Sequence, residues 1–173
     1  MKIHNKLYEY HVDSISMIHS VTIRKIQPSD LHQIVNLERK CFSEQNAYSQ
    51  RQLKYLITKA NSCCLAELQN GMIRGFIIVL FRKGTTVAGI ETINVDPQYR
   101  GLGIGQKLIT AAESEMYPQS IKRVRLEVSS GNISAIRLYE KLGFKKIALL
   151  ENYYFFQYYG SSNAYRMIKD LAI

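Results

Sequence analysis

The chain has 173 residues and a formal net charge of +9, with 23 Lys and Arg against 14 Asp and Glu. This length predicts one domain with a substantial core, and no apolar run is long enough to span a membrane. Three cysteines without a disulfide or metal pattern indicate a reducing cytoplasm. The positive charge favours a polyanionic ligand such as a phosphorylated cofactor. Because the basic residues are scattered, we do not expect direct binding of nucleic acid.

The first 20 residues predict no clear helix or strand, and we expect an N-terminal extension to a domain that spans residues 21–173. The extension is polar and holds three of the four histidines, His4, His11 and His19. Their spacing is irregular, so we expect no metal site there.

The domain begins with a strand followed by two helices. Val21–Ile26 alternates β-branched and polar residues, which predicts a strand. Pro28-Ser-Asp30 begins a helix, and Ser49-Gln-Arg-Gln52 has the capping-box spacing that starts a second one. The polar loop between the helices, residues 43–48, is predicted to border a substrate pocket.

Three more strands follow in sequence. The Asn70-Gly71 pair is a strong turn signal between the apolar stretches Ser62–Leu68 and Met72–Arg82, which predicts a hairpin. A second turn leads to a strand over Gly89–Val95. Asp96-Pro97 ends that strand, because proline lacks an amide proton and disfavours helix at the residue before it. Four strands with two inserted helices make an α+β pattern to this point.

A glycine-rich turn follows, with Gly101, Gly103 and Gly105 at the start of a helix over Ile104–Met116. Glycine lets the backbone approach a ligand closely, and the first-turn amides of a helix have no partner inside it. Together with the helix dipole, these amides predict an anion site suited to a phosphate or pyrophosphate. A tight strand-to-helix connection that happens to use glycine is the alternative.

The last elements are two strands and a helix, followed by a further strand. Alternation predicts a strand over Lys122–Val128, and Asn132 is the expected N-cap of a helix over Ile133–Leu142. Phe144–Leu150 is the next strand, and the segment Asn163–Leu171 is expected to form a final edge strand.

Two motifs resemble those of the GNAT N-acetyltransferase superfamily. Arg100-x-x-Gly103-x-Gly105 is similar to its first signature, and Asn132-x-x-Ala135-x-x-Leu138-Tyr139-x-x-Leu142-Gly143-Phe144 to its second. Leu126-Glu-Val-Ser-Ser-Gly-Asn132 and Asn152-Tyr-Tyr154 are similar to the RimI-like branch, whose members acetylate protein N-termini. The resemblance implies a three-layer α+β fold, with a mixed, mostly antiparallel, splayed sheet of about seven strands and about four flanking helices.

The resemblance also implies acetyl-CoA as the acetyl donor. The backbone of the strand before the glycine turn is expected to pair with the pantetheine arm, as an added strand would, and the loop amides to hold the pyrophosphate. The expected cofactor-binding residues are Ile93, Asn94, Val95, Arg100, Gly101, Leu102, Gly103, Ile104, Gly105, Gln106, Asn132 and Tyr139.

An amine near neutral pH is mostly protonated, so it must lose a proton to a general base before it attacks the thioester. No histidine follows His32, which leaves the carboxylates. Glu127 matches the base of the RimI-like branch and is the first candidate, and Glu91, on the strand beside the cofactor, is its rival. Tyr139 is the expected general acid, which gives a proton to the departing CoA thiolate.

On the substrate side, Glu91, Tyr153 and Tyr154 are expected to contact the acceptor, although both tyrosines could equally pack the end of the sheet. The expected reaction is direct transfer in a ternary complex to the N-terminal α-amine of a protein, such as a ribosomal protein, by a cytoplasmic monomer or homodimer. Acetylation of a polyamine or an aminoglycoside is the alternative, and a non-catalytic CoA-binding module is a third. Asn163-Ala164 stands where the branch has Asp-Ala, which weakens the peptide assignment.

Overall fold

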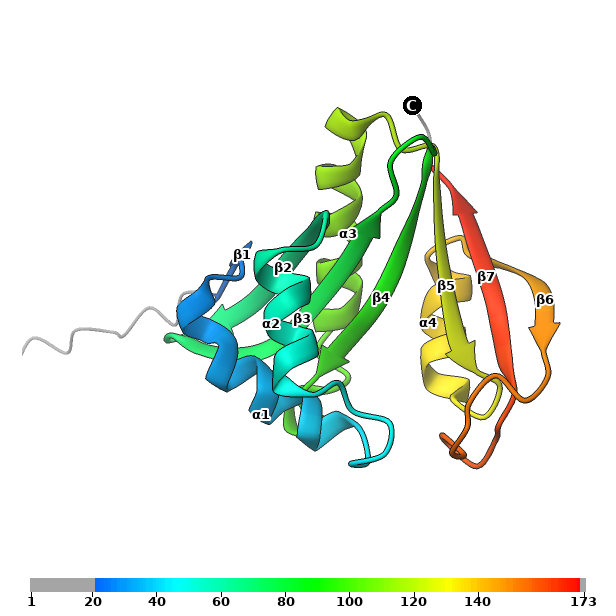
Figure 1. Cartoon of the computed structure of the whole chain (residues 1–173), viewed down its shortest axis with the longest axis horizontal. Helices are drawn as coiled ribbons and strands as arrows, with labels where there is room; N and C mark the ends of the chain where they lie inside the picture. The colour runs from blue at the N-terminus through cyan, green and yellow to red at the C-terminus, as the bar shows by residue number, and fades with distance from the viewer. Residues whose placement is uncertain (1–20, 172–173) are drawn as a thin grey trace, which may run out of the picture.

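A computed structural model describes residues 21–171 (Figure 1). The predicted N-terminal extension, residues 1–20, lies outside the described residues. Seven strands form one sheet in the order β1-β2-β3-β4-β5-β7-β6. The strands are β1 (Val21–Lys25), β2 (Ser62–Gln69), β3 (Met72–Phe81), β4 (Val87–Val95), β5 (Arg123–Ser129), β6 (Lys145–Leu150) and β7 (Ala164–Asp170). The helices are α1 (Leu31–Cys41), α2 (Gln50–Thr58), α3 (Ile104–Met116) and α4 (Ile133–Lys141).

Local sequence signals place the helix starts and the hairpin turn as predicted. The side chain of Ser49 accepts a hydrogen bond from the amide of Gln52, which completes the capping box at the start of α2. The side chain of Asn132 accepts one from the amide of Ala135 at the start of α4. The Asn70-Gly71 turn between β2 and β3 has φ of +52° and +78°, values that this residue pair adopts readily.

The helices cover the two faces of the sheet unequally, and two apolar clusters lie beneath them. Helices α3 and α4 pack on one face of the sheet over a cluster that extends from β2 to β7. Helices α1 and α2 pack on the other face, over apolar side chains of β2 and β3. Within the described residues, no helix covers this second face over β5, β7 and β6. The predicted α+β fold with a three-layer arrangement is confirmed.

The sheet splays between its two central strands. β4 and β5 form the one parallel pair among the described strands, and they pair only where Val87–Gly89 lie beside Arg123–Arg125. Figure 1 shows the two strands joined at one end and separating toward the other. The backbone of β4 beyond Gly89 therefore has no strand beside it on the β5 side.

The prediction of a final edge strand is wrong. β7 lies between β5 and β6, pairs with both in antiparallel fashion, and buries Ala164 and Met167 completely. β6 is instead the edge strand at this end of the sheet, and β1 is the edge strand at the other. No helix in the described part of the chain has the length and apolar character needed to cross a membrane.

Candidate active site

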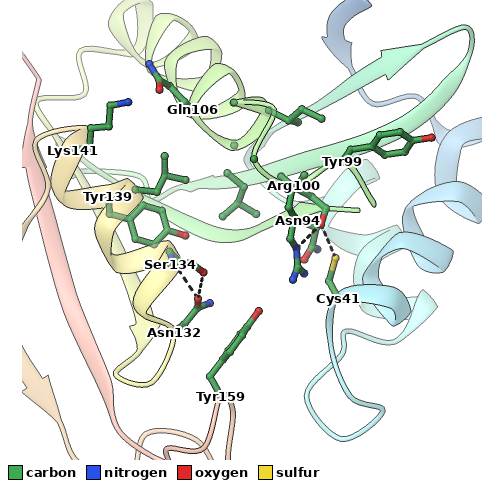
Figure 2. A pocket seen from close by; sticks show the side chains of 18 of the residues that line it. Cys41, Asn94, Tyr99, Arg100, Gln106, Asn132, Ser134, Tyr139, Lys141 and Tyr159 are labelled. Atoms are coloured by element: carbon green, nitrogen blue, oxygen red, sulfur yellow. Dashed lines mark hydrogen bonds between the residues drawn. The ribbon is translucent and has the colours of Figure 1, made fainter. Parts of the chain in front are cut away.

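A cavity of about 470 Å³ lies where β4 and β5 separate (Figure 2). Of the residues expected to bind the cofactor, all but Leu102 line it. Leu102 is 60% exposed and stands between two glycines with positive φ. Eight further residues line this cavity that sequence reasoning did not assign to it: Cys41, Tyr99, Ser134, Ala135, Leu138, Lys141, Tyr158 and Tyr159.

The glycine turn forms one wall of this cavity. Gly101 and Gly103 have φ of +81° and +75°, in the left-handed region that glycine adopts without steric cost. Gly103 is the N-cap of α3 and supplies no side chain to that cap, so the first-turn amides of α3 stay available to a ligand. Gly105 lets α3 and α4 approach each other, because an added Cβ would lie 3.1 Å from Cδ2 of Leu138. The wall suits a pyrophosphate.

Side-chain contacts hold residues 96–99, which lead into the glycine turn, in place. The carboxylate of Asp96 accepts hydrogen bonds from Nζ of Lys40 at 2.7 Å and from the amide of Gln98 at 3.0 Å. Burial alone would raise the pKa of Asp96, but these two donors lower it below its usual value. The guanidinium of Arg74 lies over the ring of Tyr99, 5.3 Å from its centroid.

Arg74 is held by a buried partner on the neighbouring strand. Its guanidinium pairs with both carboxylate oxygens of Glu67, whose side chain is fully buried. Its carbonyl accepts the amide of Asp96 at 2.8 Å. The ion pair between Glu67 of β2 and Arg74 of β3 therefore supports the position of Tyr99 in the cavity wall.

The end of β4 presents polar groups to the cavity. The carbonyl of Val95 accepts Nε of Arg100 at 3.3 Å and Sγ of Cys41 at 3.4 Å. The side chain of Asn94 is turned into the protein, where it donates to Glu38 at 2.6 Å. Figure 2 shows Arg100 and Asn94 on the opposite side of the cavity from Tyr139.

A second cavity of about 240 Å³ adjoins the first on the side of the α1–α2 loop. Tyr48 of that loop borders it, as predicted for a substrate pocket. The three predicted acceptor-side residues, Glu91, Tyr153 and Tyr154, line it as well, and so does the predicted general base, Glu127. The two cavities share Ile93, Asn132, Tyr139 and Tyr158 in their walls. A ligand in one cavity can therefore meet a ligand in the other beside Tyr139.

Two carboxylates face the second cavity in different electrostatic surroundings. Glu127 on β5 accepts Nε of Arg166 at 2.7 Å, and Nε of Arg125 lies 3.4 Å from the same oxygen. Glu91 on β4 accepts a hydrogen bond from the hydroxyl of Tyr48. Two guanidiniums thus share Glu127, whereas Glu91 forms no ion pair with any described residue.

A buried carboxylate positions the Tyr48–Glu91 pair. Glu38 of α1 is completely buried and accepts the amide of Tyr48 at 3.0 Å and the side-chain amide of Asn94 at 2.6 Å. Burial raises the pKa of Glu38, and the two hydrogen bonds oppose this rise. Glu38 therefore connects the loop that carries Tyr48 to the strand that carries Glu91. Its isolated position in the sequence of α1 gave no signal of this role.

Tyr139, where the two cavities meet, is buried, and Tyr154, in the wall of the second cavity, is partly buried. Burial raises the pKa of Tyr139 well above its usual value, so its hydroxyl stays protonated at neutral pH. Burial also raises the pKa of Tyr154 to about 12. The loop that carries Tyr154 is fixed against β5, because the hydroxyl of Ser129 donates to the carbonyl of Tyr158. An added Cβ at Gly131 would lie 1.9 Å from the carbonyl oxygen of Tyr159, so only glycine fits there.

The chain is similar to known acetyltransferases. The model of the acetyltransferase (GNAT) family matches residues 31–144. The ribosomal protein bS18-alanine N-acetyltransferase of Escherichia coli K12 is 30% identical over 139 residues, which cover 77% of this chain and 86% of that protein. N-alpha-acetyltransferase 30 of Schizosaccharomyces pombe is 31% identical over 137 residues, 78% of this chain and 90% of that protein. A crystal structure of the Escherichia coli ribosomal-protein-S18-alanine N-acetyltransferase matches with a TM-score of 0.79 and 25% identity, over 89% of this chain and 96% of that one.

Proposed function

Because the chain belongs to the GNAT acetyltransferase family and is an acetyl-CoA-dependent N-acetyltransferase, we propose that its acceptor is the N-terminal α-amine of a polypeptide. The observation that carries this proposal is the pair of adjoining cavities that share Tyr139. The larger cavity has the glycine turn in its wall and a volume of about 470 Å³ for the cofactor. The smaller opens beside the α1–α2 loop and presents two carboxylates.

The charges of the smaller cavity favour an acceptor with a single ammonium group. Arg125 and Arg166 already share Glu127, so Glu91 is the carboxylate left for the acceptor among the described residues that line this cavity. A polyamine would bring several positive charges close to the two arginines, and their repulsion opposes its binding. The N-terminus of a polypeptide brings a single positive charge. The similarity to N-terminal acetyltransferases from a bacterium and a yeast supports the same acceptor class.

The residues that line the smaller cavity then have distinct roles. Acetyl-CoA, when bound, supplies the thioester that the amine attacks. Glu91, oriented by Tyr48, binds the acceptor ammonium, and Tyr153 and Tyr154 position it. Glu127 accepts the proton that the ammonium loses, directly or through water. Tyr139 gives its proton to the departing thiolate. The raised pKa of Tyr139 keeps its hydroxyl protonated until that step.

Acetyl-CoA turnover measured across a panel of N-terminal peptides, spermidine and an aminoglycoside tests the acceptor. We expect activity on peptides with a free N-terminus and none on the same peptides with a blocked one. Activity confined to spermidine or the aminoglycoside would refute the proposal. Binding of CoA without turnover of any amine would favour the non-catalytic module.

Two substitutions test the division between the carboxylates. We expect Glu127→Gln to lower kcat by about 10²-fold or more, and Glu91→Gln to raise the KM of the peptide with a smaller effect on kcat. The opposite pattern would assign proton transfer to Glu91. Gln preserves the shape of each side chain, so the unfolding midpoint of each variant checks that the fold is kept.

A further inference from the structure

The face of β5, β7 and β6 that no described helix covers is basic next to the smaller cavity. Cross-strand pairing places side chains in rows on this face. Arg125, Ile168 and Lys145 form one row across the three strands, because Ile168 pairs with both of the others. Glu127 and Arg166 are partners in the adjacent row. We call these five residues the basic face.

The positive charges of the basic face exceed its negative charges. Arg125, Arg166 and Lys145 supply three cations, and Glu127 is the one carboxylate among them. The side chains of Arg125 and Arg166 are 45% and 35% exposed, and Lys145 is exposed and forms no ion pair with a described residue. The next row toward the start of β5 adds no net charge, because Arg123 pairs with Asp170 at 2.7 Å.

The basic face continues directly from the acceptor cavity. Glu127 belongs to both. Tyr153, in the cavity wall, lies near Arg125 and Arg166: burial raises the pKa of Tyr153, and the two positive charges oppose that rise. Strands in a sheet lie about 4.8 Å apart, so β6 is about 10 Å from β5. An extended chain covers that distance in about three residues.

We propose that the basic face binds acidic residues at about positions three to five of the acceptor polypeptide. This inference rests on the proposed function, since it needs an acceptor whose chain leaves the cavity beside Glu127. Carboxylates at about positions three to five of the acceptor come within reach of Arg125, Arg166 and Lys145. The same charges disfavour acceptors with basic residues at these positions.

Three peptides that share the first two residues, Ala-Ser, and continue with three Glu, three Gln or three Lys test the proposal. We expect kcat/KM to fall in the order Glu, Gln, Lys, by about two- to fivefold for each charge changed at low salt. The difference should reside mainly in KM and shrink when sodium chloride is raised to 0.5 M, because salt screens exposed charges.

Charge reversal at Lys145 tests whether this face is responsible. Lys145→Glu should lower kcat/KM for the Glu peptide and raise it for the Lys peptide, while the Gln peptide keeps its wild-type value and reports an intact fold. Lys83→Glu, in the exposed turn between β3 and β4 at the joined end of the two central strands, is the matched control and should leave the order unchanged.

The outcomes separate this inference from the function on which it rests. Equal turnover of the three peptides, or preference for the Lys peptide, would overturn the inference and leave N-terminal acetylation intact. A Glu preference that Lys145→Glu does not alter would also overturn it. Turnover of small amines without turnover of any peptide would refute the proposed function, and the inference with it.

Discussion

Removing one partner of the ion pair between Glu67 and Arg74 should lower the unfolding free energy far more than removing both. Both side chains are nearly inaccessible, with 0% and 8% exposed, and both Glu67 oxygens accept from the Arg74 guanidinium. Arg74→Met leaves a buried carboxylate without its partner, a change that typically costs about 3–5 kcal/mol of unfolding free energy. We expect about 3 kcal/mol, at the lower end of this range, because Arg74 also contacts Tyr99 and Gln69, which are themselves partly exposed.

Urea unfolding followed by circular dichroism measures this cost. A loss of about 3 kcal/mol should lower the midpoint by about 1–2 M. Adding Glu67→Leu to Arg74→Met removes both charges and should recover most of the loss, because an apolar pair replaces a buried ion pair with little net change. The exposed pair of Arg123 and Asp170 is the control, and Arg123→Met should cost no more than about 1 kcal/mol.

A kinetic measurement on the same variants tests the connection to the cofactor cavity. Arg74→Met removes the cation that lies over the Tyr99 ring, so we expect a higher KM for acetyl-CoA with little change in kcat. The double variant should keep this higher KM even where its stability is recovered. If Arg74→Met and Arg123→Met cost the same free energy, or if the two changes at the buried pair are additive, the reasoning from burial is wrong.

Three further changes should each alter one measurable property. Tyr139→Phe should lower kcat by about 10²-fold at an unchanged unfolding midpoint, and normal turnover would remove its role as general acid. Gly75→Ala should destabilise the fold by about 1–3 kcal/mol in urea, because the new Cβ would lie 2.8 Å from Cγ2 of Ile104; a neutral result would mean that α3 shifts freely over β3. The hydrogen bond from Arg24 chiefly lowers the pKa of Asp30, so its contribution to stability is present above about pH 4 and is lost as the pH falls through the lowered pKa. Arg24→Gln should flatten the unfolding free energy between pH 5 and 2, and a profile identical to wild type would contradict this assignment.

The residues that line the larger cavity could largely be predicted from sequence, because their signals are local. Pro97 ends a strand, glycines permit positive φ, and the amides that face the cavity belong to consecutive residues, so one stretch of sequence contains nearly all of the wall. Leu102 is the exception: it lies between two glycines with positive φ, and its side chain is exposed. The acceptor side depends on contacts between distant residues. Tyr48 and Glu91 are 43 residues apart, and no sequence pattern pairs them.

The order of the strands shows the same difference between local and distant information. Periodicity identifies a strand over the last part of the chain, but it carries no information about which strands lie beside it. The insertion of β7 between β5 and β6 therefore could not be derived from the alternation of its residues. That position matters for the site, because it brings Arg166 beside Glu127.

A bulge in β4 explains why the face of the sheet that Glu91 occupies could not be derived from the alternation of residues in its own strand. Opposite β3, Ile78 pairs with Thr92 and Val79 with Ile90, which leaves Glu91 as the extra residue. Ile90, before the bulge, packs in the cluster under α3, whereas Asn94, after it, bonds to Glu38 of α1. Strict alternation would place both on one face. The bulge thus reverses the two faces of β4 at the residue that meets Tyr48, and it leaves the Glu91 carboxylate exposed toward the acceptor cavity.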